Sequence, residues 1–409
     1  MGMNELWAHL SCEWEGVDGS QLRGKTLAID GQVWLYECTR EACSTQRSLL
    51  FGFFSRCKKI MEEGIIPYLL FDRYQNSPVN TFMSEDSADK TYERDGRPIK
   101  VDENARSRFG RGSIDDNSVS RVIQLLQCMG IPYFYSHGVD NEAAASYLEE
   151  TGKADGFISP QMEYFLYGGA NLYRVEFEKN GSFLSASYQR ITAEKLFLSH
   201  GLNRARMVAL AALLGCDYIG KGIAGIGLVI SLELLSEFSI SEDDHPITIL
   251  DRFRSYCSEE LSIRKGDSPT RLKLRRNHFS FPQGFPNSDV FSMSINAFMW
   301  PNLESLPFFT PPRLPYNNSK IQALLLEEES RGVSDISERA RRAVTFGAGK
   351  RSTERAAPFS RRQRVAIDIL RHATLATAFL SVPPPSPPLL TPSSSSSSSL
   401  PPPPKKMRR

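Results

Sequence analysis

The pattern of apolar and polar residues predicts short buried strands that alternate with helices. Residues 25–29 form a strand-like run that closes at Asp30, and a helical pattern begins at Val33. Residues 65–71 are apolar without interruption, which is typical of a strand buried on both faces of a sheet, and Asp72 follows directly. Because the carboxyl ends of parallel strands share one edge of a sheet, we expect Asp30 and Asp72 to converge there.

The alternation continues in the middle of the chain. Residues 119–129 predict an amphipathic helix, and residues 131–135 predict the next strand. A further helix is predicted to begin at Asp140, with Glu142 in its first turn. Ordinary helix capping would also place acidic residues at these two positions, so the pair alone does not separate a structural role from a functional one.

Two more acidic residues follow apolar segments. Glu163 lies just beyond a short strand and a turn in the segment 155–168. Asp217 ends the apolar helical run of the segment 209–227, which continues into a turn with glycine at positions 220, 222, 225 and 227. A carboxylate beside such a turn can hold a hard metal ion, and the backbone N–H groups of the turn can approach a phosphate closely. A buried Asp in a tight turn between two helices is the alternative.

Six acidic residues therefore stand at strand ends or helix starts: Asp30, Asp72, Asp140, Glu142, Glu163 and Asp217. In one shared pocket, repulsion and desolvation would raise their pKa values or drive them apart unless cations neutralise them. We therefore expect an oxygen-only site for Mg²⁺, with two ions about 3.5–4 Å apart, of the kind that activates water for phosphodiester hydrolysis. The six histidines are scattered and offer no competing ligand set.

Composition sets the class of protein. With 409 residues and 41% hydrophobic residues, the chain is long enough for one large or two ordinary domains with a buried core. The net charge is only +2, but Lys and Arg gather in segments 264–276 and 331–371, which are either phosphate-binding surfaces or solvated basic faces. The seven cysteines form no CxxC pair, and no run of about 18 apolar residues occurs. We expect a soluble, intracellular protein in a reducing compartment, with no membrane partner.

Several segments together resemble the flap endonuclease/XPG superfamily of structure-specific DNA nucleases. They are AIDGQVWLYE, LLFDR, VDNEAAASYL, DGFISPQMEYFLYG and LLGCDYIGKGIAGIG, in the order that the family has. The opening MGMNELW and the stretches FLYGGANLYR and GCDYIGKG are most similar to the Holliday junction resolvase (GEN-like) branch. The resemblance covers residues 1–245 and, more faintly, residues 280–325.

The resemblance implies a role for each carboxylate. One metal ion would be surrounded by Asp30, Asp72, Asp140 and Glu142. The second would be served by Glu163 and Asp217. Mg²⁺ is the implied cofactor, with Mn²⁺ as a substitute. The glycine turn would be a helix-two-turn-helix motif that grips the uncut duplex, which makes the expected DNA-binding positions Gly222, Gly225 and Gly227, with Gly2 near the active site after removal of the initiator Met.

The chain also departs from the family pattern. Gln161 stands where the family has the first Asp of an Asp-x-Asp pair; its amide oxygen can coordinate a metal but supplies no charge, so we expect a weaker second metal site. Asp140 replaces the usual Glu and is one methylene shorter. Leu228 follows the last glycine of the turn, where Lys is usual.

The polar segment 73–117 predicts either a mobile lid over the carboxyl edge of the sheet or an ordinary surface insertion. Residues 74–89 contain no Lys or Arg, although the family has basic residues there. Arg106, Arg108 and Arg111 resemble the basic part of the family lid, and we assign Arg106 and Arg108 to DNA binding.

We expect an α/β fold with a mostly parallel central sheet flanked by helices. Five regions are predicted: 1–100 (N-terminal nuclease region), 101–207 (internal nuclease region), 208–260 (helix-two-turn-helix region), 261–328 (helical extension) and 329–409 (basic, Pro/Ser-rich disordered tail). In the tail, residues 361–372 permit a helix that either binds DNA or is part of a solvated, partly ordered segment. The Pro and Ser runs from residue 382 cannot build a core.

The last residues and the motifs together lead to a functional prediction. The terminal cluster Lys405, Lys406, Arg408 and Arg409 resembles a nuclear localisation signal, so we expect an import receptor as partner and a nuclear location. The predicted function is Mg²⁺-dependent cleavage of branched DNA, either Holliday junctions or 5′ flaps, in DNA repair and recombination. The alternatives are a catalytically weakened protein that binds branched DNA and a Mg²⁺-dependent phosphatase. Because resolving a junction takes two incisions, a dimer on the junction is a further hypothesis.

Overall fold

The structure of the protein is a computed structural model. It describes residues 3–45, 48–73, 116–137, 139–180, 183–216, 218–219, 222–258, 267–277, 279–301, 315–330 and 358–381. The helices are α1 (Met3–Leu10), η1 (Ser11–Glu13), η2 (Gly19–Leu22), α2 (Gly31–Thr45), α3 (Leu49–Glu62), α6 (Asp116–Met129), α7 (Asn141–Glu150), η4 (Met162–Tyr167), α8 (Ala193–His200), α9 (Arg204–Leu214), α10 (Leu228–Phe238), α11 (Pro246–Ser258), α12 (Pro269–Arg276), α13 (Asp289–Met299), α14 (Asn318–Ser330) and α16 (Arg361–Ser381).

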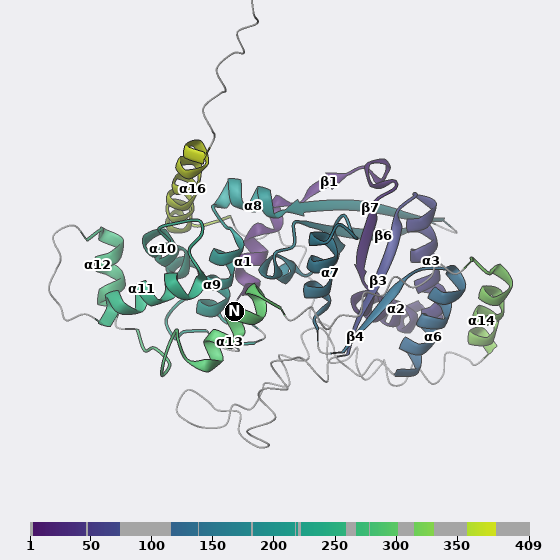
Figure 1. The fold of residues 1–409 in the computed structure, drawn as a ribbon. Helices are drawn as coiled ribbons and strands as arrows, with labels where there is room; N and C mark the ends of the chain where they lie inside the picture. Colours follow the sequence, from purple (N-terminus) through teal and green to yellow (C-terminus); the bar gives the residue numbers. More distant parts are fainter. Residues whose placement is uncertain are drawn as a thin grey trace, which may run out of the picture.

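The central sheet of the described residues has seven strands in the order β1-β7-β6-β5-β2-β3-β4 (Figure 1). The strands are β1 (Glu15–Val17), β2 (Thr26–Asp30), β3 (Ile66–Arg73), β4 (Tyr133–His137), β5 (Phe157–Ile158), β6 (Asn171–Asn180) and β7 (Phe183–Thr192). The pairs β2–β3, β2–β5, β3–β4 and β5–β6 are parallel, which confirms the predicted mostly parallel sheet. The antiparallel pairs β6–β7 and β1–β7, which the sequence pattern does not predict, extend one edge.

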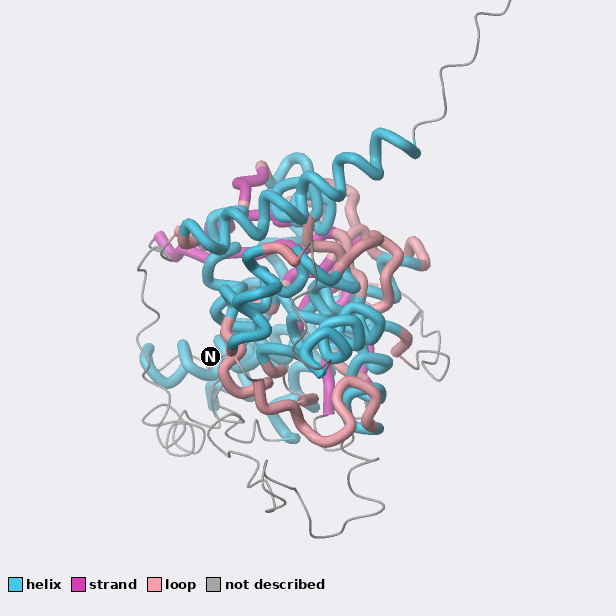
Figure 2. The backbone as a smooth tube through the Cα atoms, turned by 90° about the vertical axis from the view of Figure 1, so that its left-hand side faces the viewer, coloured by secondary structure: helices cyan, strands magenta, loops and turns pink. Residues whose placement is uncertain are grey.

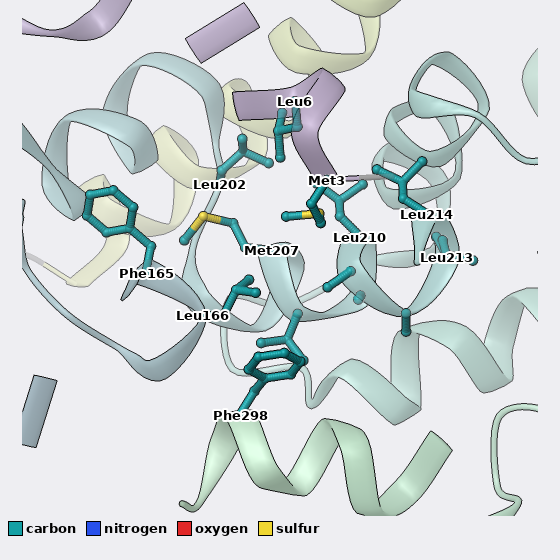
Figure 3. Packing of buried hydrophobic residues seen from close by; sticks show 14 of the residues in the cluster. Met3, Leu6, Phe165, Leu166, Leu202, Met207, Leu210, Leu213, Leu214 and Phe298 are labelled. Atoms are coloured by element: carbon teal, nitrogen blue, oxygen red, sulfur yellow. The ribbon is translucent and has the colours of Figure 1, made fainter. Parts of the chain in front are cut away.

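Helices cover both faces of the sheet, which explains why β2 and β3 are apolar throughout. Ile29 and Phe71 belong to the core that α2, α3 and α6 form on one face, whereas Ala28 and Leu70 belong to the core on the other face. On this second side α9 is buried from residue 206 to residue 214. Figure 3 shows how α1, η4, α9 and α13 meet there, with Met3 beside Met207 and Leu210 and with Phe298 of α13 below them.

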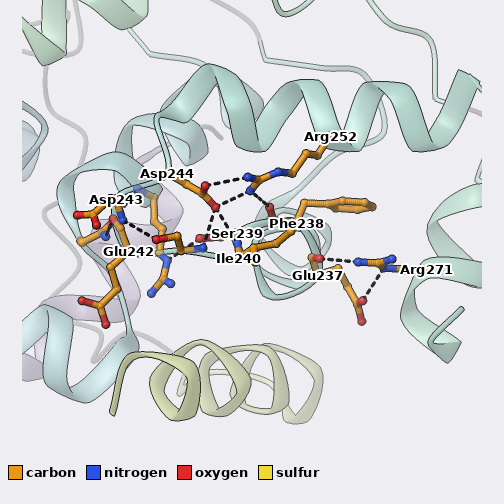
Figure 4. A network of polar contacts seen from close by, with 12 residues as sticks. Glu237, Phe238, Ser239, Ile240, Glu242, Asp243, Asp244, Arg252 and Arg271 are labelled. Atoms are coloured by element: carbon orange, nitrogen blue, oxygen red, sulfur yellow. Dashed lines mark hydrogen bonds and ion pairs between the residues drawn. The ribbon is translucent and has the colours of Figure 1, made fainter. Parts of the chain in front are cut away.

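Helices α10, α11, α12, α13 and α16 form a helical lobe around α9, at the end of the molecule away from β3 and β4 (Figures 1 and 2). The connection between α10 and α11 is fixed by Asp244 (Figure 4). Its carboxylate accepts hydrogen bonds from the backbone N–H groups of Ile240 and Ser241 at 2.8 and 2.9 Å and from Arg252 Nη2 at 2.9 Å. These contacts hold α11 against the end of α10.

The C-terminal part of the described chain is helical. Within the predicted tail, residues 361–381 form α16, because the apolar residues Ala366, Ile367 and Leu370 recur at helical spacing and are buried against the rest of the protein. Within the predicted helical extension, α12 and α13 join the helical lobe, whereas α14 packs on α3 and α6 on the other side of the sheet. Residues 331–357 and 382–409, with the basic terminus, lie outside the described residues.

None of the helices that the structure describes is long and apolar enough to cross a membrane.

Candidate metal centre

Asp30 is the last residue of β2 and is almost completely buried, with 2% of its surface exposed. The chain enters α2 directly after it, which requires a glycine: a Cβ at Gly31 would lie 2.5 Å from the ring of Phe71 and 2.7 Å from the carbonyl oxygen of Leu70. The N–H of Val33 donates to Asp30 Oδ1 at 3.0 Å, so the carboxylate also caps α2. This turn fixes Asp30 at the carboxyl edge of the sheet.

Two side chains from other elements contact Asp30. Asn141 Nδ2 of α7 donates to Oδ1 at 3.2 Å, and Ser159 Oγ, just after β5, donates to Oδ2 at 3.2 Å. Burial raises the pKa of Asp30 to about 6, and these hydrogen bonds oppose that shift only in part. Within the described residues every donor to this carboxylate is neutral, so a bound cation would stabilise its ionised form.

Asn141 has a second feature of a metal site. Its Oδ1 is buried and has no hydrogen-bond partner among the described residues. A buried amide oxygen without a partner costs free energy, and amide oxygens are accepted ligands of Mg²⁺ and Ca²⁺. Asn141 was not among the predicted site residues, although it lies between two of them, Asp140 and Glu142.

Asp140 occupies the N-cap position of α7 and is held by two tyrosines. Tyr167 Oη donates to Asp140 Oδ2 at 2.6 Å, and Tyr218 Oη donates to the same oxygen. Burial, together with the charge of Asp140, raises the pKa values of both tyrosines, so both hydroxyls stay protonated. The ring of Phe298 lies 5.2 Å from that of Tyr167 and 4.8 Å from that of Tyr218. The tyrosine pair therefore links α7, η4 and the turn after α9.

The remaining described acids lie on the same elements. Glu142, in the first turn of α7, is 7% exposed. Glu163 of η4 is half-buried and accepts a hydrogen bond from Trp7 Nε1 at 2.8 Å, which ties α1 to η4. The backbone N–H of Gln161 donates to Ser159 Oγ at 3.1 Å, so the position that departs from the family pattern adjoins a partner of Asp30.

The other predicted site residues are described only in part or not at all. The backbone of Asp72 lies in β3 and pairs with Ser136, two positions beyond Leu70, the partner of Asp30. The side chain of Asp72 and several whole residues lie outside the described residues: Asp217, Gly2, Arg106, Arg108, Arg111 and the rest of the segment 74–115.

The described side chains do not form a complete metal site. Among them, no group of three or more His, Cys, Asp or Glu residues comes together as one could around an ion. The structure links Asp30 to α7 through Asn141, and Asp140 and Glu142 are the sequence neighbours of Asn141. The predicted cluster of six carboxylates remains a prediction. The donor chemistry of Asp30 and Asn141 fits Mg²⁺, since a buried carboxylate without a cationic partner among the described residues lies beside an amide whose oxygen has no hydrogen-bond partner there.

The glycine turn between α9 and α10 contains two kinds of glycine. A Cβ at Gly222 would lie 2.1 Å from the carbonyl oxygen of Leu213, so this residue is needed for packing against the end of α9. Gly225, with a φ of +80°, and Gly227 are exposed and have no atom within 4 Å of such a Cβ. Their backbone can therefore be approached from solvent.

Comparison with known proteins finds similarity in two regions of the chain. Residues 1–90 match the XPG N-terminal domain, and residues 130–217 match the XPG I-region. The two matched regions contain all six predicted carboxylates.

One relative of this chain is the Mus musculus protein Flap endonuclease GEN homolog 1. The two are 29% identical over 241 residues, which are 58% of this chain and 25% of the relative. The chain thus spans about a quarter of the length of the first curated relatives that it matches.

Two solved structures share the fold. The catalytic core of Rad2 in complex with DNA substrate has a TM-score of 0.58 at 23% identity, over 83% of this chain and 99% of that chain. The Holliday junction-resolving enzyme GEN1 in complex with product DNA and a Mg²⁺ ion has a TM-score of 0.51 at 18% identity, over 85% of this chain and 78% of that chain.

Proposed function

We propose that this protein is a Mg²⁺-dependent endonuclease that hydrolyses phosphodiester bonds in branched DNA, either Holliday junctions or 5′ flaps, in DNA repair and recombination. The observation that carries the proposal is the environment of Asp30, a buried carboxylate at the carboxyl edge of the sheet whose described donors are all neutral. The two XPG domain matches support the substrate class, since the proteins that the chain resembles include a flap endonuclease and a Holliday junction-resolving enzyme.

In this proposal the six carboxylates divide between two ions. The first is held by Asp30, Asp72, Asp140 and Glu142. The second is held by Glu163 and Asp217. When bound, Mg²⁺ supplies positive charge at the scissile phosphate and activates water, and Mn²⁺ can replace it. Asn141 and Ser159 orient Asp30, while Tyr167 and Tyr218 orient Asp140.

Contacts to DNA come from backbone and basic groups. The accessible amides around Gly225 and Gly227 bind duplex phosphates, and Gly222 keeps the turn in place. Gly2, Arg106 and Arg108 are proposed as further DNA contacts near the cut site.

A branched-DNA-binding protein with weakened catalysis is the second candidate, and Gln161 favours it. The neutral side chain of Gln161 stands where the resemblance implies an Asp, and this lowers the negative charge available to the second ion. The replacement Gln161→Asp restores that charge. It should raise the cleavage rate if the natural site is only weakened, and it should leave cleavage absent if the protein only binds DNA.

The decisive experiment is cleavage of end-labelled Holliday junction, 5′ flap, splayed-arm and plain duplex DNA with Mg²⁺. We expect cuts in branched substrates, no cuts in the plain duplex, and loss of all cuts in Asp30→Ala. Symmetrical nicks in the junction would favour resolution over flap cleavage. Tight binding to branched DNA without cutting by either protein would overturn the endonuclease proposal in favour of the binding protein.

The proposal also extends to assembly and location. Two coordinated incisions require two active sites, so two copies should bind one junction; a stoichiometry of one protein per junction under cutting conditions would contradict this. The basic cluster at residues 405–409 should direct the protein to the nucleus through an import receptor, which the localisation of a fluorescent fusion with and without these residues tests.

A further inference from the structure

A group of exposed arginines near the glycine turn takes no part in the proposed metal centre. Arg276 ends α12, and Arg361 and Arg364 lie in the first turn of α16; all three side chains are exposed. We call these three residues the α12–α16 basic surface. Figure 1 shows α16 rising from α10, with α12 on the outer side of the same lobe.

One buried carboxylate joins the helices that carry this surface. Glu233 of α10 is 8% exposed and accepts hydrogen bonds from Arg362 Nε at 2.8 Å and Arg362 Nη2 at 2.7 Å. Lys273 Nζ of α12 reaches the same carboxylate at 3.5 Å. Burial acts in the opposite direction, but the hydrogen bonds from Arg362 and the charge of Lys273 lower the pKa of Glu233, so it remains ionised. Glu233 thus fixes α12 and α16 relative to α10.

The three surface arginines are not paired with acidic side chains in the part of the chain that the structure describes. Among the described residues, no ion pair or side-chain hydrogen bond is formed by Arg276, Arg361 or Arg364. In contrast, Arg271 Nε contacts Glu237 Oε2 at 3.0 Å. Arg361 and Arg364 are three residues apart on α16 and are therefore neighbours on the helix surface, so their like charges repel one another and an anionic ligand would relieve that repulsion.

The surface has a fixed position relative to the glycine turn. Glu233 follows Gly227 by six residues of α10, which is about 9 Å along a helix axis. One turn of B-DNA is roughly 34 Å long, so a duplex held by the turn is long enough to reach the surface.

We infer that the α12–α16 basic surface binds the phosphate backbone of the duplex arm that the glycine turn holds. The inference rests on the proposed function, because it takes the partner to be the DNA that the glycine turn grips. Phosphate contacts of this type are independent of base sequence and release counterions, so they strengthen binding in a salt-dependent way. The surface should therefore add affinity for long duplex arms without affecting the chemistry of cleavage.

The test compares Arg361→Ala/Arg364→Ala with the wild-type full chain. The matched control is Lys58→Ala/Lys320→Ala, which removes two exposed charges from α3 and α14 on the other side of the molecule. Binding of fluorescein-labelled duplex, 5′ flap and junction DNA is measured by anisotropy without Mg²⁺ between 50 and 200 mM KCl. The slope of log K against log salt is negative, and each lost phosphate contact makes it shallower by about 0.9. We therefore expect the slope to become less negative by about 1.8 on all three DNAs and to stay unchanged in the control.

The outcomes separate this inference from the proposed function. If the variant has the same slope as the wild type, or if the control variant changes by the same amount, the basic surface does not bind DNA, even if the wild type cleaves branched DNA. A slope that is less negative by about 1.8, together with no cleavage by the wild type, would support the surface and reject the endonuclease. Thermal unfolding of each variant shows whether α16 stays docked, and Arg276→Ala, on α12, gives a second variant that leaves α16 unchanged.

Discussion

At the scale of single residues, Asp30 is the group whose chemistry depends most on its surroundings. Its folded-state pKa of about 6 lies above the roughly 3.9 of an unfolded chain. Below pH 4 the carboxyl is protonated in both states and folding carries no penalty. As the pH rises from 4 to 6 the unfolded chain ionises first, so metal-free folded protein loses stability, by roughly 3 kcal/mol at most.

The replacement Asp30→Asn should remove this penalty. In EDTA at pH 7.5 we expect the variant to unfold at a higher temperature than the wild type, with the two converging near pH 4. Mg²⁺ should raise the unfolding temperature of the wild type more than that of the variant, and cleavage should be lost. If the variant unfolds at the same temperature as the wild type or at a lower one in EDTA at pH 7.5, then the buried carboxylate of Asp30 does not destabilise the metal-free folded protein.

The tyrosine pair on Asp140 gives a second prediction at this scale. Tyr167→Phe keeps the ring contact with Phe298 but removes the donor that lies 2.6 Å from Asp140 Oδ2. A hydrogen bond to a charged group contributes about 1.5–3 kcal/mol, so we expect cleavage to fall roughly 10- to 100-fold. Titration of the rate with Mg²⁺ should show a higher metal requirement, while the unfolding temperature in EDTA changes little. A lower rate with an unchanged Mg²⁺ requirement would assign Tyr167 a role other than holding Asp140.

At the scale of elements, the glycine turn contains one glycine that packing requires, Gly222, and one that is open to solvent, Gly227. Gly222→Ala places a methyl group 2.1 Å from the carbonyl oxygen of Leu213, so we expect the turn to be disrupted and the protein to be destabilised by about 2–4 kcal/mol. Gly227 has a φ of −104° and open space around it, so Gly227→Ala should fold like the wild type.

The pair of variants is compared by thermal unfolding and by DNA anisotropy. Gly227→Ala should bind duplex DNA more weakly at unchanged stability, because its methyl group would occupy the space through which we propose that a phosphate approaches the turn. Unchanged DNA binding by Gly227→Ala would remove this part of the turn from the proposed duplex contact.

At the scale of the whole molecule, α16 connects the far end of the described chain to the helical lobe. Ile367 and Leu370 are buried, and burying a large apolar side chain contributes about 1.5–3 kcal/mol. A chain that ends at residue 357 should therefore be less stable than the full chain by roughly 3–6 kcal/mol in urea unfolding. A chain that ends at residue 381 is the control and should match the full chain. Equal stability of all three chains would show that α16 does not contribute to the fold.

The sequence alone determined the features that depend on neighbouring residues. The uninterrupted apolar run 65–71 predicted a doubly buried strand, and the acids at strand ends predicted a shared edge for Asp30 and Asp72; the structure has both residues at the carboxyl ends of the adjacent strands β2 and β3. The quoted motifs predicted a resemblance to XPG nucleases, and the comparisons match residues 1–90 and 130–217 to the XPG N-terminal domain and I-region.

Only the tertiary structure decided which side chains contact these acids. Asn141 and Ser159 lie 111 and 129 residues from Asp30, and no local pattern links positions so far apart. The same holds for the pKa of Asp30, which depends on burial by both layers of helices, and for α16, whose weak apolar stripe becomes an ordered helix only because α8 and α10 cover it. A periodic pattern shows that a face can be buried, whereas the partner that buries it is set by the packing of distant elements.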